Sequence, residues 1–87
     1  MNPSFEYDIY FPHYYQLLNQ EAQRVLHMWN FQYEVDGHTL RVSRGSVTFD
    51  QLLAALHSSG YQTMKYRKTG QLFQDWTNYK HYRDDSD

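Results

Sequence analysis

An Asp-Gly pair between two alternating segments constrains the fold of this chain more than any other feature. Apolar and polar side chains alternate over residues 31–35 and again over 38–42, with Asp36-Gly37 between them. Asp-Gly favours a two-residue β-hairpin loop, because both central positions of the preferred turn need positive φ. Such a loop pairs the two segments with their apolar residues on one face: Val35 with His38, Tyr33 with Leu40, and Phe31 with Val42.

A strand and a helix are expected before this hairpin. Side chains alternate between apolar and polar from Phe5 to Phe11, which is typical of a strand with one buried face. Pro12 ends that strand, since proline cannot donate a backbone hydrogen bond, and it suits the first turn of a helix. Apolar residues then recur with helical spacing over residues 14–29, so we predict a helix over 13–30.

A second, shorter helix is expected after the hairpin. Thr48 is followed three residues later by Gln51, which is the spacing of a capping box. The helical spacing of apolar residues ends before Gly60, which can adopt the left-handed conformation that often follows a helix. These signals predict a helix over residues 48–59.

The remaining residues, 61–83, are expected to form a strand, a turn and a strand. Lys68-Thr69-Gly70 suits a three-residue loop with glycine at the left-handed bulge position. Residues 84–87 contain three aspartates and are expected to be a frayed acidic tail. Residues 1–83 are then one compact α+β domain.

The order β-α-β-β-α-β, with room for an extra C-terminal strand, predicts an α+β fold. An antiparallel sheet with two helices on one face, the ferredoxin-like arrangement, is the expected architecture. An α+β sandwich with a different strand order is the alternative. The residues expected in the core are Phe11, Leu18, Val25, Trp29, Tyr33, Leu40, Leu52 and Leu56.

Composition narrows the class of protein. The 87 residues include nine Tyr, five Phe and two Trp, so aromatic side chains must supply much of the core. There is no Cys, which excludes disulfides and zinc–sulfur sites. No apolar run approaches the ~20 residues of a membrane span, and the first residues do not resemble a signal peptide. A cytoplasmic protein with no membrane association is therefore expected.

No catalytic or metal-binding pattern is found. The five histidines include no His-x-x-x-His pair, so no shared metal is expected. Glu6 and Asp8 fall on one face of the first strand and Glu34 on the outward face of the hairpin, where we expect ordinary solvated charges. The sequence therefore predicts a protein that is not an enzyme, with no cofactor and no metal.

The C-terminal third carries the candidate binding surface. Five basic residues and one acidic residue lie between positions 61 and 83, and aromatic residues are interleaved with them. Tyr, Trp and Arg are enriched at protein interfaces, whereas cations with flat rings also suit single-stranded nucleic acid. The predicted partner-binding residues are Lys65, Tyr66, Arg67, Lys68, Trp76, Tyr79, Lys80 and Tyr82.

Two functions are compatible with this surface. We expect a small non-enzymatic regulator or inhibitor that occupies the surface of another protein, as phage and mobile-element accessory proteins do to host proteins. The alternative is a single-stranded RNA-binding module, although the sequence pI of about 6.2 is low for such a domain. A homodimer is also expected to be accessible, since an exposed edge strand can pair with its copy.

Overall fold

Five strands and two helices follow one another in the part of the chain that the computed structural model describes, residues 5–12, 19–61, 63–69 and 76–79. In chain order they are β1 (Tyr7–Tyr10), α1 (Gln20–Met28), β2 (Tyr33–Asp36), β3 (Thr39–Val42), α2 (Phe49–Ser58), β4 (Lys65–Lys68) and β5 (Thr77–Asn78).

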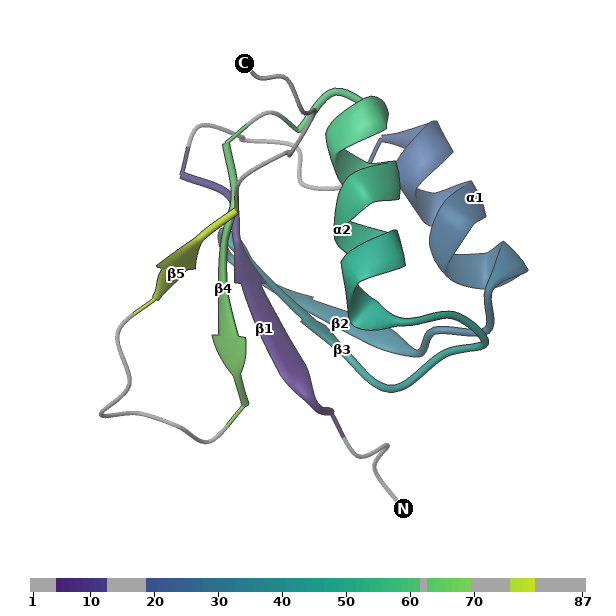
Figure 1. Ribbon diagram of the computed structural model, residues 1–87, viewed down its shortest axis with the longest axis horizontal. Coiled ribbons are helices and arrows are strands. Elements are labelled where there is room, and N and C mark those ends of the chain that lie inside the picture. The colour runs from purple at the N-terminus through teal and green to yellow at the C-terminus, as the bar shows by residue number, and fades with distance from the viewer. Residues whose placement is uncertain (1–4, 13–18, 62, 70–75, 80–87) are drawn as a thin grey trace.

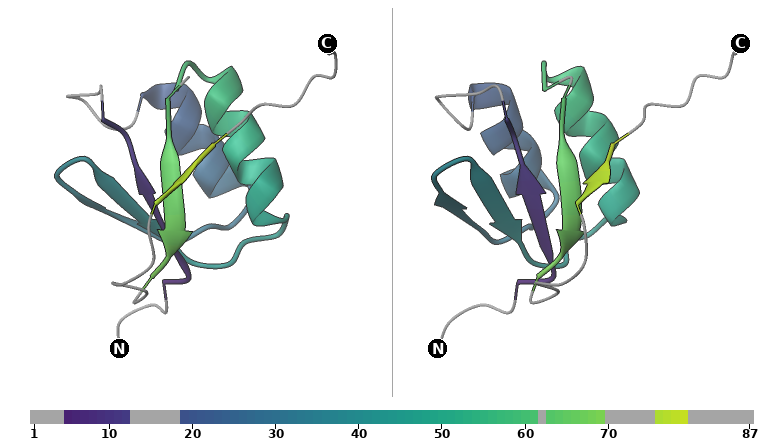
Figure 2. Two further views of the ribbon diagram at one scale, coloured as in Figure 1. Left: turned by 60° about the vertical axis from the view of Figure 1, so that its left-hand side comes forward. Right: turned by 90° about the vertical axis from the view of Figure 1, so that its left-hand side faces the viewer.

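The strands form one antiparallel sheet in the order β2-β3-β1-β4-β5. Both helices lie on the same face of this sheet and pack against one another (Figures 1 and 2). The predicted α+β class is confirmed, as is the antiparallel sheet with two helices. The ferredoxin-like arrangement has four strands, and the five-strand order seen here differs from it, so that finer prediction is not confirmed.

The predicted hairpin forms, but its register differs by two residues from the prediction. Asp36 pairs with Thr39, so the two-residue loop is Gly37-His38 rather than Asp36-Gly37. Gly37 has a φ of 61°, and positive φ at the first loop position alone is the pattern of a type II′ turn. Asp36 stays in the ladder, where its carboxylate lies 3.4 Å from Arg41 Nη1. A shift of two residues leaves each side chain on its predicted face.

Helix α1 is shorter than predicted. It begins at Gln20, because Asn19 has an extended conformation and its side chain accepts a hydrogen bond of 2.8 Å from the Ala22 amide. Asparagine is among the preferred N-cap residues for this reason. The Asn19 amide donates to the Tyr61 hydroxyl at 2.7 Å, which ties the start of the helix to the segment after α2. The predicted start at residue 13 lies outside the described residues, as does Leu18 of the predicted core.

Helix α2 confirms its predicted signals. Thr48 and Gln51 form the reciprocal capping box, and the helix ends one residue before the C-cap Ser59. Gly60 has a φ of 118°, and the amide of Tyr61 donates to the Leu56 carbonyl at 3.1 Å. This bond and the one from Gly60 to His57 are those of a Schellman motif.

The predicted loop at residues 68–70 is wrong. Strand β4 pairs with β5 through Lys65 with Asn78 and Tyr66 with Thr77, which is incompatible with a three-residue turn after Arg67. The chain continues beside β1 instead, since the Thr69 amide donates to the Glu6 carbonyl at 3.0 Å.

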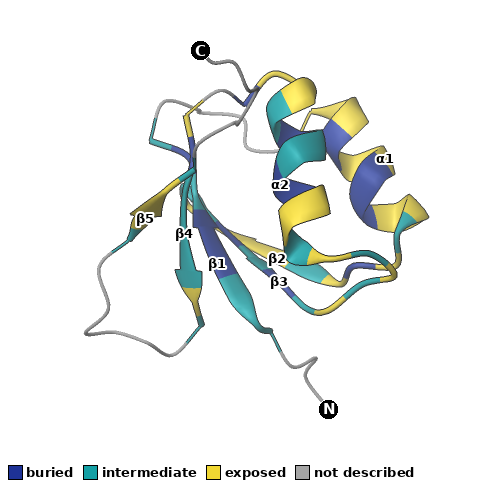
Figure 3. Ribbon diagram, in the orientation of Figure 1, coloured by how far each residue is buried: buried dark blue, intermediate teal, exposed yellow. Residues whose placement is uncertain are grey.

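The core lies between the sheet and the two helices (Figure 3). Phe11, Val25, Leu40, Leu52 and Leu56 are buried, as predicted. Trp29 and Tyr33 are only partly buried and pack against the edge of this core. The buried apolar residues are Ile9, Phe11, Ala22, Val25, Leu26, Phe31, Leu40, Val42, Leu52, Leu53, Leu56, Tyr61 and Met64.

Candidate functional site

The helix-free face of the sheet, here called the open face, carries a row of charged side chains. Because directly paired residues of neighbouring strands share a face, Asp8 of β1 lies between Arg41 of β3 and Arg67 of β4. Glu34 of β2 continues the row beyond Arg41. The right-hand view of Figure 2 looks onto this side of the sheet, with both helices behind it. The described strand residues of the open face are Asp8, Tyr10, Glu34, Asp36, Thr39, Arg41, Lys65, Arg67 and Asn78.

Asp8 is the centre of this row and is only 5% exposed. Its Oδ1 accepts a hydrogen bond of 2.7 Å from the Thr69 hydroxyl and lies 3.7 Å from Arg41 Nε. Its Oδ2 lies 3.7 Å from Arg67 Nε. A carboxylate buried this deeply needs such partners, since an unpaired buried charge is strongly unfavourable. The expectation that Asp8 is an ordinary solvated charge is therefore wrong.

Arg67 is held by an aromatic ring as well as by Asp8. Its guanidinium carbon lies 4.1 Å from the centre of the Trp76 ring, which is a cation–π contact. Trp76 in turn lies against Tyr10, with 5.7 Å between the ring centres. Arg67 Nε is buried and has no hydrogen-bond partner among the described residues, because 3.7 Å to Asp8 is too long for a hydrogen bond. Tyr10, Arg67 and Trp76 are called the aromatic–arginine cluster below.

The structure divides the predicted partner-binding residues between the two faces of the sheet. Lys65, Arg67 and Trp76 belong to the open face, whereas Tyr66 and Tyr79 pack against the core on the helix side. Lys68 pairs with Tyr7 and so shares the helix side, although it is exposed at the end of β4. Lys80 and Tyr82 lie outside the described residues.

Tyr79 illustrates the helix-side environment. Its ring lies 5.7 Å from that of His57 on α2, and its amide donates to the Met64 carbonyl at 2.9 Å. Burial raises the pKa of the Tyr79 hydroxyl above its ordinary value of 10.0, and the charges of Asp50 and Tyr66 add to the rise. Tyr79 is therefore a neutral, partly buried side chain that joins β5 to α2.

Three residues of the open face were not predicted from the sequence to belong to the binding site. These are Tyr10, Asp8 and Arg41. Asp8 lies beside Arg67 and is shared with Arg41, and Tyr10 lies against Trp76. One signal was available: an acidic residue stands at the middle of a strand whose other face is apolar. That signal becomes informative only when β1 is known to lie between two strands that each carry an arginine.

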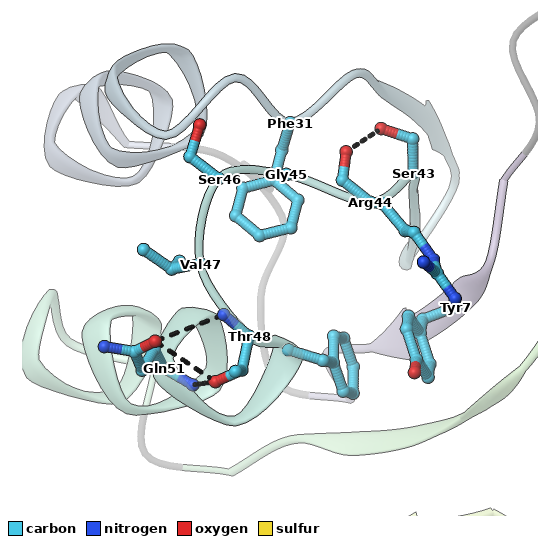
Figure 4. A pocket seen from close by; sticks show the side chains of 10 residues that line it. Tyr7, Phe31, Ser43, Arg44, Gly45, Ser46, Val47, Thr48 and Gln51 are labelled. Carbon is cyan, nitrogen blue, oxygen red and sulfur yellow. Dashed lines mark hydrogen bonds between the residues drawn. The ribbon is translucent and has the colours of Figure 1, made fainter.

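A cavity of about 470 Å³ lies at the loop between β3 and α2, away from the open face (Figure 4). Phe31, Phe49 and Tyr7 supply its aromatic walls, and the rings of Tyr7 and Phe49 are stacked at 3.8 Å. The Gly45 backbone closes over the Phe31 ring, so that a Cβ at this position would lie 2.6 Å from Phe31 Cδ2. This loop therefore needs glycine because the ring lies against its backbone.

We expect the Gly45→Ala variant to lose about 1–3 kcal/mol of stability, the usual cost of overpacking a well-packed site. Phe31 is 5% exposed and cannot move away without disturbing the core. Urea denaturation followed by circular dichroism measures this loss. Gly37→Ala is the comparison for strain without a steric clash, since its φ is 61° and a Cβ there contacts nothing within 4 Å, whereas Gly45 does not have a positive φ. If the free energy of unfolding of Gly45→Ala equalled that of wild type, the close approach of the Phe31 ring to the Gly45 backbone would be contradicted.

The described residues offer no metal site and no membrane-spanning helix. Among the described residues no group of three or more His, Asp or Glu side chains is placed to hold a metal ion. Neither described helix has the length and apolar character needed to cross a membrane. No family model, curated protein or solved structure matches this chain. The candidate functional site is therefore defined by geometry alone, as the open face with the aromatic–arginine cluster.

Proposed function

We propose that this protein is a small non-enzymatic regulator or inhibitor that binds another protein through the open face. The aromatic–arginine cluster is the observation that carries the proposal. Tyr, Trp and Arg are the residue types that most often dominate the binding energy of protein interfaces. Here Trp76 contacts both Arg67 and Tyr10 on the side of the sheet that neither helix covers.

The charges of the open face also favour a protein partner. Its described strand residues include three acidic and three basic side chains: Asp8, Glu34, Asp36, Arg41, Lys65 and Arg67. A mixed surface of this kind matches a partner of complementary mixed charge, whereas a polyanion meets repulsion from the acidic residues. Binding then regulates the partner by covering its surface.

Two further predictions stay untested: that the protein is cytoplasmic, and that it forms a homodimer through an edge strand.

A single-stranded RNA ligand is the second candidate. Trp76 and Tyr10 lie on the open face with Lys65 and Arg67, and rings beside cations on an exposed sheet are how several RNA-binding modules stack bases. Salt dependence separates the two candidates. Each phosphate contact to a single strand contributes about −0.7 to the slope of log K against log salt, whereas a protein interface with few ion pairs has little slope.

Affinity purification with matched variants tests the proposal. The wild-type protein and the Tyr10→Ser, Trp76→Ala and Arg24→Glu variants are used as baits, and the recovered proteins are identified by mass spectrometry. Arg24 is the control, because it is 71% exposed on α1, away from the open face. We expect one protein to be recovered by wild type and Arg24→Glu and lost by the two open-face variants. Equal recovery by all four baits, or recovery that nuclease treatment abolishes, would contradict it.

A further inference from the structure

The charge of the open face differs between its β2 side and its β4 side. Arg41 lies within 4 Å of three carboxylates: Asp8 at 3.7 Å, Glu34 at 3.6 Å and Asp36 at 3.4 Å. Among the described residues, Arg67 has one carboxylate neighbour, Asp8, and shares it with Arg41. Lys65 adds a further positive charge on the same side. Among the side chains that the structure describes, the β2 side of the face is therefore acidic and well paired, and the β4 side carries more positive than negative charge.

Arg67 is held in place before any partner binds. Its side chain is only 19% exposed, since its guanidinium lies on Trp76 and its Nε points toward Asp8. A planar guanidinium fixed in this way loses little conformational freedom on binding. Its Nε is buried and faces Asp8, so a partner reaches Arg67 only through the terminal Nη1 and Nη2 atoms of the guanidinium.

We propose, on the basis of the proposed function, that Arg67 binds a carboxylate of the partner protein, an exposed Glu or Asp side chain. Arginine and carboxylate match in shape and form two parallel charge-assisted hydrogen bonds. Trp76 and Asp8 act as positioning residues that set the plane of the guanidinium. A phosphate chain fits less well, since its higher charge lies close to Asp8 and its path across the sheet meets Glu34 and Asp36.

The role of Asp8 follows from the same geometry. Its negative charge lies beneath Arg67, at 3.7 Å from Nε, and it is buried rather than available to a ligand. It therefore offsets part of the arginine charge and keeps the pair nearly neutral. Among the described residues of the β4 side, Arg67 and Lys65 carry two positive charges against the one negative charge of Asp8, so one further carboxylate balances them.

The experiment uses defined probes, so it does not depend on the identity of the partner. The ¹⁵N-labelled full chain is titrated with the blocked peptide acetyl-Gly-Glu-Gly-amide, its Gln counterpart, inorganic phosphate and an octamer of uridine. The arginine Nε–H and tryptophan indole N–H signals are followed by nuclear magnetic resonance. Arg44 is the internal control, since its side chain is 84% exposed and its Nε lies 3.5 Å from Glu6.

We expect the Glu peptide to shift the Arg67 and Trp76 signals with saturation, and the Gln peptide to leave them unchanged. Arg67→Lys should weaken the Glu peptide about tenfold, because an ammonium neither stacks on the ring nor forms the two-bond contact. The indole N–H signal of Trp76 reports binding in the Arg67→Lys variant, and unchanged backbone amide signals show that this variant is folded. Arg44→Lys should leave the affinity unchanged.

Failure of the Glu peptide to bind overturns the inference, and so do three other outcomes. The first is an equal response to the Glu and Gln peptides, and the second is an Arg44 response as large as that of Arg67. The third is saturation by phosphate or by the uridine octamer without saturation by the Glu peptide, which indicates an RNA ligand. If the Glu peptide does not bind, but Tyr10→Ser and Trp76→Ala still fail to recover the protein that wild type recovers in the affinity purification, only the assignment of a carboxylate to Arg67 is wrong. If the Glu peptide does not bind and those two variants recover the same proteins as wild type, the proposed function is wrong as well.

Discussion

We expect the Leu40→Asp variant to be unfolded at 25 °C. Leu40 is fully buried in the central part of the sheet, between Ile9 of β1 and Val35 of β2. An aspartate there has no described cation beside it, so folding must either bury an unpaired carboxylate or protonate it. The loss should be about 4 kcal/mol or more, which is a large part of the stability of a small domain. Far-UV circular dichroism and the dispersion of amide proton signals measure it.

Val35→Asp is the matched control, since Val35 lies directly opposite Leu40 on the same face but is 46% exposed. The same substitution there should cost about 1 kcal/mol or less. A cooperative transition for Leu40→Asp at the wild-type midpoint would falsify the burial of Leu40 and with it the pairing of β3 with β1.

The Asp8→Ala variant should lose about 2–3 kcal/mol. Removing one partner of a fully buried ion pair costs roughly 3–5 kcal/mol, and the value here is lower because Arg41 and Arg67 are 33% and 19% exposed. The variant leaves both arginines without their shared carboxylate and removes the acceptor of the Thr69 hydroxyl. Urea denaturation at neutral pH measures the change in the free energy of unfolding.

Two variants separate the sources of this loss. Asp8→Asn keeps an acceptor for Thr69 and removes only the charge, so its loss should fall between those of wild type and Asp8→Ala. Glu34→Ala removes a carboxylate that is 54% exposed and should cost less than about 1 kcal/mol. Equal losses for Asp8→Ala and Glu34→Ala would mean that burial of Asp8 contributes nothing.

Residues 48–61 show what short-range signals can predict. The capping box joins Thr48 to a residue three positions away, and the Schellman motif joins Tyr61 to a residue five positions away. Both depend on contacts within one or two helical turns, so the sequence contains every partner. The face of each residue in β2 and β3 was predictable for a similar reason, because the alternation of a strand is a property of its own sequence.

By itself, the sequence therefore determined the α+β class, the positions of the hairpin and of α2, and which side chains face the core. Only the tertiary structure decided the hairpin register, the path of the chain after Arg67 and the burial of Asp8. The path of the chain and the burial of Asp8 depend on contacts between segments far apart in the sequence: Thr69 with β1, and Asp8 with two arginines. The register differs because Asp36 pairs with Thr39 in the ladder, whereas the Asp-Gly signal alone places it in the loop. An aspartate in an alternating strand is predicted to be solvated, and it becomes buried here because neighbouring strands supply the cations that make its burial favourable.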